Sequence, residues 1–186
     1  MSCNRLSATF AIGALFSAPA LAEPLAQVSS PDGRITVALS TDADARISYA
    51  ILQNGKPLIA PSLLGFTLTD ALPMIRGFKF DGAQTSSHDA TWEQPWGERR
   101  FVRDHHNEIL VRFSEKDRLK RQMNIRFRVF NDGVGFRYEL PEQPNLKTMR
   151  IQDEMTEFAV APKGQAWWIQ GSEWNRYEQI YQNTAI

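Results

Sequence analysis

Two short blocks of the sequence concentrate side chains that could contact a sugar, namely TWEQPWGE at residues 91–98 and AWWIQGSEW at residues 166–174. Indole rings stack on the apolar faces of sugar rings, and neighbouring carboxylates and amides can bind hydroxyl groups. Trp168 and Trp174 are therefore the candidate substrate-binding residues. The alternative, which the sequence leaves open, is that these tryptophans fill an apolar core. Because Trp167 and Trp168 are adjacent, a strand would point them to opposite faces, so at most one could be buried.

Glu178 is the carboxylate with the most unusual surroundings, because WNRYEQIY at residues 174–181 places aromatic residues, an amide and an arginine close to it. A glycosidase needs two carboxylates at a defined separation, which spacing along strands cannot establish. The other acidic residues are expected to lie on the solvated face of a sheet. They include Glu93, Glu98, Glu108, Asp153, Glu154, Glu157 and Glu173.

The three histidines give little support for metal or acid–base chemistry. His105 and His106 would point apart on a strand, and no cysteine accompanies them or His88. Structural zinc usually needs four ligands, so ordinary surface histidines are expected. The sequence has no G-x-S-x-G, H-E-x-x-H, P-loop or dinucleotide motif, and so gives no support to nucleophilic or phosphate chemistry.

The first 22 residues have the pattern of a secretory signal peptide. Arg5 precedes an apolar run at Ala8–Phe16, and the small-residue site Ala20-Leu21-Ala22 follows it. Cleavage after Ala22 would leave a periplasmic or secreted chain of residues 23–186. The run is too short to span a membrane, and no second long apolar run follows.

The composition of the chain excludes several kinds of chemistry and of binding partner. The only cysteine, Cys3, lies in the signal, so neither a disulfide nor a thiol nucleophile is expected. The 21 basic and 21 acidic residues of the full sequence balance, which gives no electrostatic case for nucleic acid or an anionic membrane as a partner. The length of residues 23–186 predicts about one domain.

The elements that must position these residues are strands. Apolar residues recur at every second position, no long window has the helical period, and Asn54-Gly55 and Asn131-Asp132-Gly133 have the composition of hairpin turns. We therefore predict an all-β fold, an antiparallel β-sandwich, in which Gly133 can adopt the left-handed conformation that a short turn needs. The predicted strands lie around Ile35–Leu39, Ile47–Ile51, Leu58–Ile59, Gly65–Leu68, Ile109–Phe113, Ile125–Val129 and Val134–Leu140. The run Glu157–Trp168 is also strand-like, with a break at Pro162–Gly164. The section 81–90 is polar and is not predicted as a strand.

Nine blocks, in order, resemble the N-terminal domain of glycoside hydrolase family 97 and cover essentially the whole mature chain. The hairpin block together with the Trp-Gly-Glu and Ala-Trp-Trp blocks is the specific part of the resemblance. The blocks are SPDGRITV, NGKPLI, PSLLGF, WGE, HHNEILVRF, FRVFNDGVGFRYE, DEMTEF, AWW and YEQIY.

The resemblance implies a galactose-mutarotase-like β-super-sandwich from a secreted or periplasmic α-glucosidase or α-galactosidase. In that family a separate (β/α)8 barrel supplies the catalytic carboxylates, so the expected partners are that missing barrel and an α-linked oligosaccharide. The resemblance also implies that the sandwich would continue beyond Ile186, so we expect a fragment or a degenerate copy of a larger enzyme, with an incomplete sandwich. The resemblance also implies that Glu178 lends one carboxylate to a calcium site completed by the barrel. Asn131 could approach the barrel as well, although a local turn role is the alternative.

Two readings from other classes remain open. One is a free-standing periplasmic saccharide-binding module that uses exposed tryptophans. The other is a structural β-sandwich that docks a partner through an uncovered apolar edge.

Overall fold

The computed structural model describes residues 23–161, 164–171, 174–176 and 178–186, and all regular structure in them is β-strand. The predicted all-β fold is therefore confirmed. No helix in this part of the chain is long and apolar enough to cross a membrane. The strands are β1 (Ala26–Ser29), β2 (Ile35–Thr41), β3 (Ile47–Gln53), β4 (Lys56–Leu63), β5 (Phe66–Leu68), β6 (Phe78–Glu93), β7 (Phe101–Glu115), β8 (Gln122–Val129), β9 (Val134–Glu139), β10 (Ile151–Glu154), β11 (Gln165–Trp168) and β12 (Gln182–Ala185).

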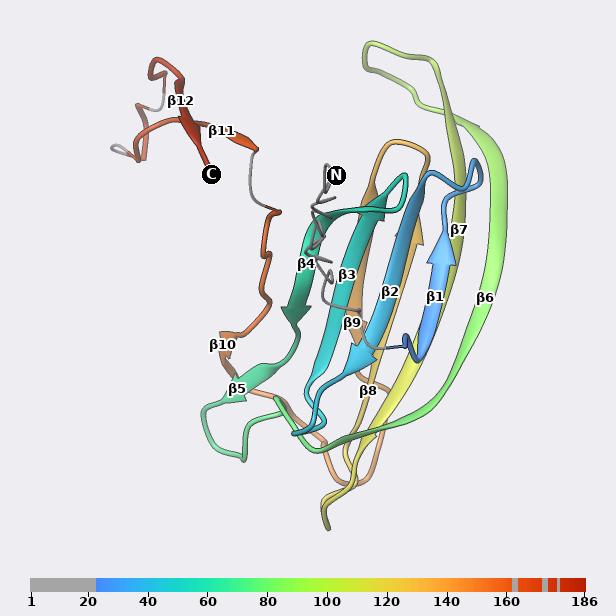
Figure 1. Cartoon of the computed structure of the whole chain (residues 1–186), viewed down its shortest axis with the longest axis vertical. Coiled ribbons are helices and arrows are strands. Elements are labelled where there is room, and N and C mark those ends of the chain that lie inside the picture. Colours follow the sequence, from blue (N-terminus) through green and yellow to red (C-terminus); the bar gives the residue numbers. More distant parts are fainter. Residues whose placement is uncertain (1–22, 162–163, 172–173, 177) are drawn as a thin grey trace, which may run out of the picture.

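Two four-stranded antiparallel sheets form the sandwich (Figure 1). The first has the order β1-β2-β3-β4 and the second the order β6-β7-β8-β9, so every neighbour in a sheet is also a neighbour in sequence. Two smaller pairs, β5 with β10 and β11 with β12, lie beside this sandwich. The predicted signal peptide lies outside the described residues.

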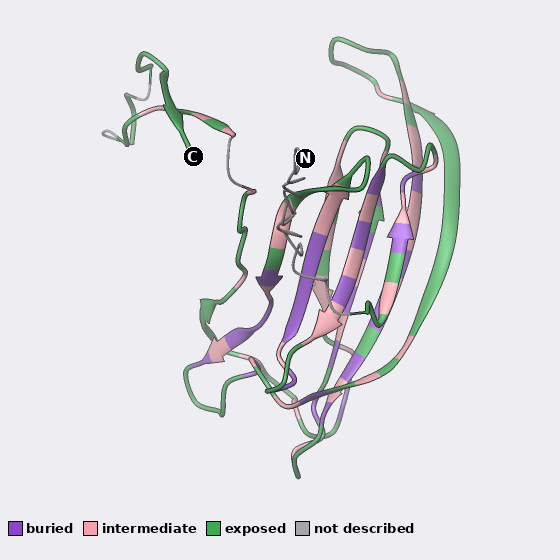
Figure 2. Ribbon diagram, in the orientation of Figure 1, coloured by how far each residue is buried: buried purple, intermediate pink, exposed green. Residues whose placement is uncertain are grey.

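The core lies between the two sheets and is built by the alternation seen in the sequence (Figure 2). Tyr49 of β3 packs its ring 5.7 Å from that of Phe127 of β8, and Phe127 in turn stacks on Phe136 of β9 at 5.0 Å. Burying such aliphatic and aromatic side chains contributes about 1.5–3 kcal/mol each. The buried cluster comprises Val28, Ile35, Val37, Leu39, Ile47, Tyr49, Leu64, Phe66, Leu68, Met74, Phe78, Ile109, Val111, Phe113, Met123, Ile125, Phe127 and Val129.

The two predicted hairpin turns differ in conformation. Asn54 and Gly55 both have positive φ, 51° and 74°, as a two-residue turn between β3 and β4 requires. Gly133 was predicted to allow a left-handed conformation, but its φ is not positive. The turn is instead closed by the Phe130 amide, which donates to the Gly133 carbonyl at 2.8 Å. Asn131 at its tip accepts a hydrogen bond from the Asp32 amide at 3.0 Å, so it ties this hairpin to the turn after β1.

The long edge strand β6 is the main element that the sequence did not reveal. It includes the polar section 81–90 and pairs with β7 from Phe78↔Glu115 to Glu93↔Phe101. After Phe80 its residues are mostly exposed. Because both faces of this part of β6 meet solvent, it needs no apolar alternation, and backbone pairing with β7 holds it in place.

The strand-like run predicted at Glu157–Trp168, with its break at Pro162–Gly164, consists of two separate features. Residues 157–161 run along the edge of β4, where the Ala60 amide donates to the Ala159 carbonyl at 2.8 Å and Ile59 bridges Val160. Among the described residues of this run, Gln165–Trp168 is the part that forms a strand, and its partner is β12.

An ion pair buried at the end of the second sheet was also not predicted. Arg121 donates to both carboxylate oxygens of Glu115, at 2.6 and 2.5 Å, and the two side chains are 2% and 4% exposed. Arg121 also donates to the carbonyls of Leu72 and Pro73, at 2.8 and 3.4 Å. The pair therefore anchors the loop between β5 and β6 to the end of β7.

Candidate functional site

The β11–β12 ribbon carries the three residues that the sequence proposed for sugar and metal binding. Trp168 ends β11, and Trp174 and Glu178 lie in the segment between β11 and β12. The ribbon is closed by four residue pairs from Gln165↔Ala185 to Trp168↔Gln182. It stands apart from the two sheets (Figure 1), and none of its described residues is buried. We call residues 164–186 the exposed C-terminal segment.

All five tryptophans of the chain are exposed, which contradicts the alternative that they fill the core. Trp168 is 45% exposed and its indole N–H donates to the Thr184 hydroxyl at 3.2 Å, whereas Trp174 is 91% exposed. Trp167 and Trp168 point to opposite faces as expected, yet neither is buried. Exposed indoles fixed on a ribbon can stack on sugar rings, although no described contact joins Trp168, Trp174 and Glu178 to one another.

Glu178 fits a calcium site only as one contributor. Its carboxylate is exposed, and carboxylate oxygens are the ligands that calcium prefers. Among the described residues, no group of three or more His, Cys, Asp or Glu side chains is placed to hold a metal ion. Calcium takes about 6–8 oxygen ligands, so Glu178 would need partners from elsewhere to form a complete site.

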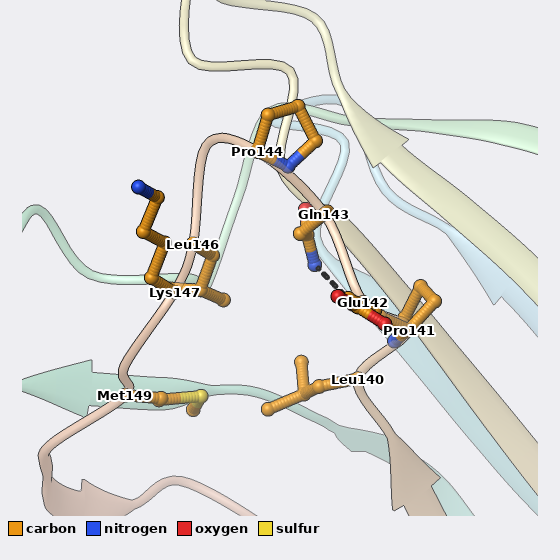
Figure 3. A pocket seen from close by; sticks show the side chains of 8 residues that line it. All are labelled: Leu140, Pro141, Glu142, Gln143, Pro144, Leu146, Lys147 and Met149. Atoms are coloured by element: carbon orange, nitrogen blue, oxygen red, sulfur yellow. Dashed lines mark hydrogen bonds between the residues drawn. The ribbon is translucent and has the colours of Figure 1, made fainter.

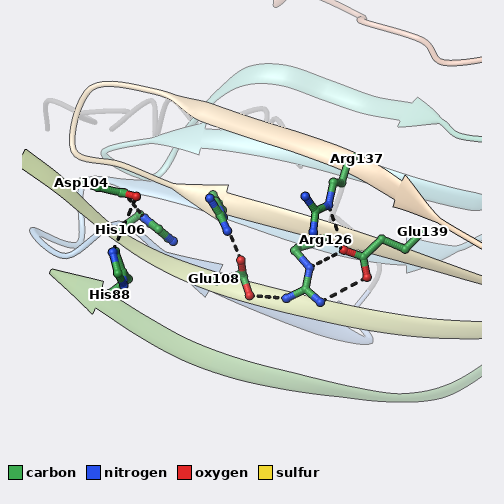
Figure 4. Close-up of polar contacts among 8 residues, drawn as sticks. His88, Asp104, His106, Glu108, Arg126, Arg137 and Glu139 are labelled. Atoms are coloured by element: carbon green, nitrogen blue, oxygen red, sulfur yellow. Dashed lines mark hydrogen bonds and ion pairs between the residues drawn. The ribbon is translucent and has the colours of Figure 1, made fainter. Parts of the chain in front are cut away.

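The solvent face of the second sheet carries a network of charged side chains (Figure 4). Glu108 accepts hydrogen bonds from Arg126 and, at 2.9 Å, from Arg128, while Arg126 and Arg137 both donate to Glu139. The hydrogen bond from Arg126 is the main reason that the pKa of Glu139 falls to about 2. Burial alone would raise the pKa of Glu108, but the hydrogen bonds from Arg128 and Arg126 outweigh it and lower this pKa. Both carboxylates are therefore ionised at neutral pH.

A second polar group at the β6–β7 ribbon contains two of the histidines. The Nδ1 atom of His106 lies 2.5 Å from Asp104, the Nε2 atom of His88 lies 3.7 Å from the same carboxylate, and the two imidazole rings are 5.2 Å apart. His106 is only 3% exposed, which corrects the expectation of three surface histidines. Its ring is buried because it packs at 5.0 Å from that of Phe130. The proximity of His88 and His106 was not predicted, because His88 lies in the polar section 81–90, which was not predicted as a strand but is part of β6.

Another hollow combines apolar side chains with one carboxylate and one amine, those of Glu142 and Lys147. It measures about 700 Å³ and lies in the loop after β9, between Leu140 and Met149 (Figure 3). Gln143 is buried at its wall, where its side chain accepts from the Gln122 amide at 2.7 Å and donates to the Gln122 carbonyl at 2.9 Å. These bonds close the loop as a turn would, so Gln143 has a structural role.

The end of the β6–β7 ribbon carries three further exposed aromatic side chains. Trp92, Trp96 and Phe101 are 51%, 83% and 58% exposed, and the Arg100 guanidinium lies 5.3 Å from the centre of the Phe101 ring. Trp92 pairs with Val102 and Phe101 pairs with Glu93, so Trp92 and Phe101 point to opposite faces of the ribbon. Isolated exposed apolar residues of this kind are common on soluble domains.

Comparison with known proteins identifies the family. The family model described as glycosyl-hydrolase 97 N-terminal matches residues 28–186, so the chain belongs to this family of N-terminal domains. A curated relative, the retaining alpha-galactosidase of Bacteroides thetaiotaomicron, is 28% identical over 131 residues, which are 70% of this chain and 18% of the relative.

Solved structures agree with this assignment. A glycoside hydrolase family 97 enzyme from Pseudoalteromonas sp., solved in complex with panose and in complex with acarbose, is 41% identical with a TM-score of 0.79. The alignment covers 86% of this chain and 24% of that enzyme. A β-arabinopyranosidase shares the fold at 21% identity, with a TM-score of 0.72 over 84% of this chain and 26% of that one. The chain thus spans about a quarter or less of the length of these relatives.

Proposed function

We propose that the chain is the sandwich domain of a calcium-dependent α-glycosidase, either an α-glucosidase or an α-galactosidase, that acts in the periplasm or outside the cell. In this proposal the catalytic carboxylates lie in a separate barrel domain. The sandwich domain borders the substrate pocket and adds one ligand to the calcium site. The observation that carries the proposal is the exposed C-terminal segment, where two indoles and a carboxylate are displayed without a core of their own.

Each residue of the segment has a defined role in this proposal. Trp168 and Trp174 stack on rings of an α-linked oligosaccharide, which is consistent with the panose and acarbose complexes of the Pseudoalteromonas relative. Glu178 supplies a carboxylate oxygen to calcium, and the remaining ligands come from the barrel. A calcium ion held in this way would join the two domains and would supply positive charge next to the substrate.

The exposed apolar residues of the segment support a buried position in the complete enzyme. Trp174, Ile180 and Tyr181 are 91%, 86% and 67% exposed, which is far more than large apolar residues show in a domain core. Packing against a second domain would remove this surface from water at a gain of about 25 cal/mol per Å².

The proposal is tested with the chain of residues 23–186 alone. We expect no calcium-dependent hydrolysis of aryl α-glucosides or α-galactosides, and calorimetry should find calcium binding weaker than about 1 mM, because one carboxylate cannot satisfy the ion. Turnover that depends on calcium and is abolished by Glu178→Ala would contradict the proposal. Micromolar calcium affinity would also contradict it, because all the ligands would then be local.

A second function, a free-standing saccharide-binding module, is favoured by the exposure of all five tryptophans. It requires maltooligosaccharides to quench tryptophan fluorescence saturably, and Trp168→Ala or Trp174→Ala to weaken the effect. In the enzyme-domain proposal these indoles bind sugar strongly only when the barrel forms the other side of the pocket. Absence of saturable quenching by the isolated chain would therefore exclude the module.

A further inference from the structure

Three adjoining hollows cross the solvent face of the second sheet from β6 to β9. The first, about 200 Å³, is lined by Ser86, His88, Asp104, Glu108 and Arg128 among others. The second, about 130 Å³, shares Ser86 and Glu108 with the first. The third, about 210 Å³, shares Arg128 with the first and surrounds Gly135 of β9. We call these three hollows together the cross-strand groove.

The strand register explains why a groove exists here. Ser86, Glu108, Arg128 and Gly135 are direct partners on the four successive strands, so they form one row across the sheet. The two outer members of the row are small and the two inner members are long and charged. A Cβ atom added at Gly135 would meet no other atom within 4 Å. The small residues therefore leave open space on both sides of the Glu108–Arg128 pair.

Two carboxylates in the walls of the groove are already held by hydrogen bonds before any ligand arrives. His106 is buried against Phe130, and its hydrogen bond to Asp104 fixes that carboxylate at the rim. Glu108 is 13% exposed and is held by Arg128 and by Arg126. Groups that are already oriented lose little conformational entropy on binding, which favours affinity.

The charges select the class of ligand. Donors and acceptors alternate along the groove, because the Glu108 carboxylate is bound by the guanidinium groups of Arg126 and Arg128 and the Asp104 carboxylate lies between the imidazole rings of His88 and His106. An anion would be repelled by the two carboxylates, and a cation by the two arginines. A neutral molecule with adjacent hydroxyl groups can donate to a carboxylate and accept from a guanidinium at the same time.

The size of the groove agrees with such a ligand. At about 30 Å³ for each liquid water, the first hollow holds roughly seven waters, which is the scale of one sugar ring. The neighbouring hollows extend this space along the row toward Gly135.

We propose that the cross-strand groove is a saccharide-binding site that takes one or two neutral pyranose units across strands β6 to β9. It is separate from the exposed C-terminal segment and does not depend on Trp168 or Trp174. Glu108 and Arg128 bind adjacent hydroxyl groups at its centre, and Asp104 and His88 bind a hydroxyl group at its β6 end.

The test is a titration of the isotope-labelled chain with maltose and, separately, galactose, followed by nuclear magnetic resonance. Saturable shifts should appear in amides of β6 to β9 and in the ring signals of His88 and His106, with a Kd of about 1–10 mM. Gly135→Leu fills the groove from a position with open space and should weaken binding at least about tenfold. Gly133→Ala, two residues away in the same hairpin and also without near neighbours, is the matched control and should leave the Kd unchanged.

Two more variants make the result decisive. Glu108→Gln should weaken binding because it removes the central acceptor, whereas Trp168→Ala should have no effect on these shifts. The amide spectrum of each variant shows whether the fold is intact. The absence of shifts at about 100 mM of either sugar, or shifts confined to residues 164–186, would overturn the proposal. So would binding of inorganic phosphate or zinc in the groove more tightly than sugar. Neither the absence of shifts nor shifts confined to residues 164–186 would contradict the proposed enzyme-domain function. Failure of the groove proposal can therefore be distinguished from failure of the proposed function.

Discussion

Replacing Arg121 by methionine tests whether the buried ion pair holds the end of the sandwich together. The guanidinium makes two hydrogen bonds to Glu115 and is almost completely buried. Methionine keeps much of the volume but leaves the Glu115 carboxylate buried without its counter-charge. It also releases the carbonyl of Leu72, which the guanidinium binds at 2.8 Å.

The expected loss of stability is about 3–5 kcal/mol, because breaking one partner of a buried pair leaves an uncompensated charge. For a domain of this size, about 1 kcal/mol changes the Tm by about 2–4 °C, so Arg121→Met should melt about 6–20 °C lower. The double variant Arg121→Met/Glu115→Leu removes both charges and should recover most of this loss. Urea unfolding followed by circular dichroism measures all the variants on one scale.

The exposed pair Arg100–Glu93 provides the matched control. Its side chains are 73% and 53% exposed, so Arg100→Met should cost less than about 1 kcal/mol. The reasoning would be refuted if Arg121→Met cost no more than Arg100→Met. It would also be refuted if the double variant were less stable than Arg121→Met alone, because the cost would then not come from a buried, uncompensated charge.

Three further predictions concern single positions. The pKa of Glu139 is lowered from 4.5 to about 2, so its ion pairs stabilise the fold above pH about 4.5 and this stability is lost as the pH falls toward 2; acid titration of Glu139→Gln should show a smaller loss over that range. Tyr49→Phe removes the hydrogen bond to the Glu157 carbonyl at 2.8 Å and should cost about 1 kcal/mol in urea unfolding, and an unchanged stability would argue against that bond. Gly65→Ala should destabilise by about 1–3 kcal/mol, because φ is 154° and the new Cβ would lie 2.6 Å from a backbone carbonyl oxygen, whereas Gly133→Ala should be nearly neutral.

The sequence predicted the parts of the fold in which one face of a strand is buried. β2 and β8 alternate apolar and polar residues, and each has its apolar residues in the core. The Asn54-Gly55 turn was predictable for a similar local reason, since the conformation depends on those two residues alone. The family was recognisable from ordered blocks of residues, and the comparisons confirm it.

The parts that were missed depend on contacts between distant residues. β6 is held by pairing with β7 and has few buried side chains after Phe80, so its polar sequence carried no strand signal. The burial of Arg121 could not be foreseen, because its partners include a carbonyl 49 residues earlier in the chain. His106 was expected on the surface, but the ring of Phe130 on β8's continuation covers it.

The exposure of the tryptophans could not be predicted either, because it depends on how the exposed C-terminal segment is placed relative to the two sheets. An indole is usually at least half buried within its own domain, so a core role was a reasonable alternative for Trp168 and Trp174. Both lie instead in the β11–β12 ribbon or the segment that joins its strands, which stands apart from the two sheets in Figure 1. In the proposed function their surroundings are completed by the barrel domain, which composition and periodicity of this chain do not encode.

The most direct test of the proposed function is a chimera in which residues 23–186 replace the matching part of the Pseudoalteromonas relative, which is 41% identical. Hydrolysis of an aryl α-glycoside that the relative cleaves is measured against calcium concentration, with the parent enzyme as control. If Glu178 supplies a calcium ligand, Glu178→Ala should raise the calcium concentration for half-maximal activity at least about tenfold, which corresponds to about 1.4 kcal/mol, and Trp96→Ala should leave it unchanged. An active chimera whose calcium dependence is unaffected by Glu178→Ala would contradict the account.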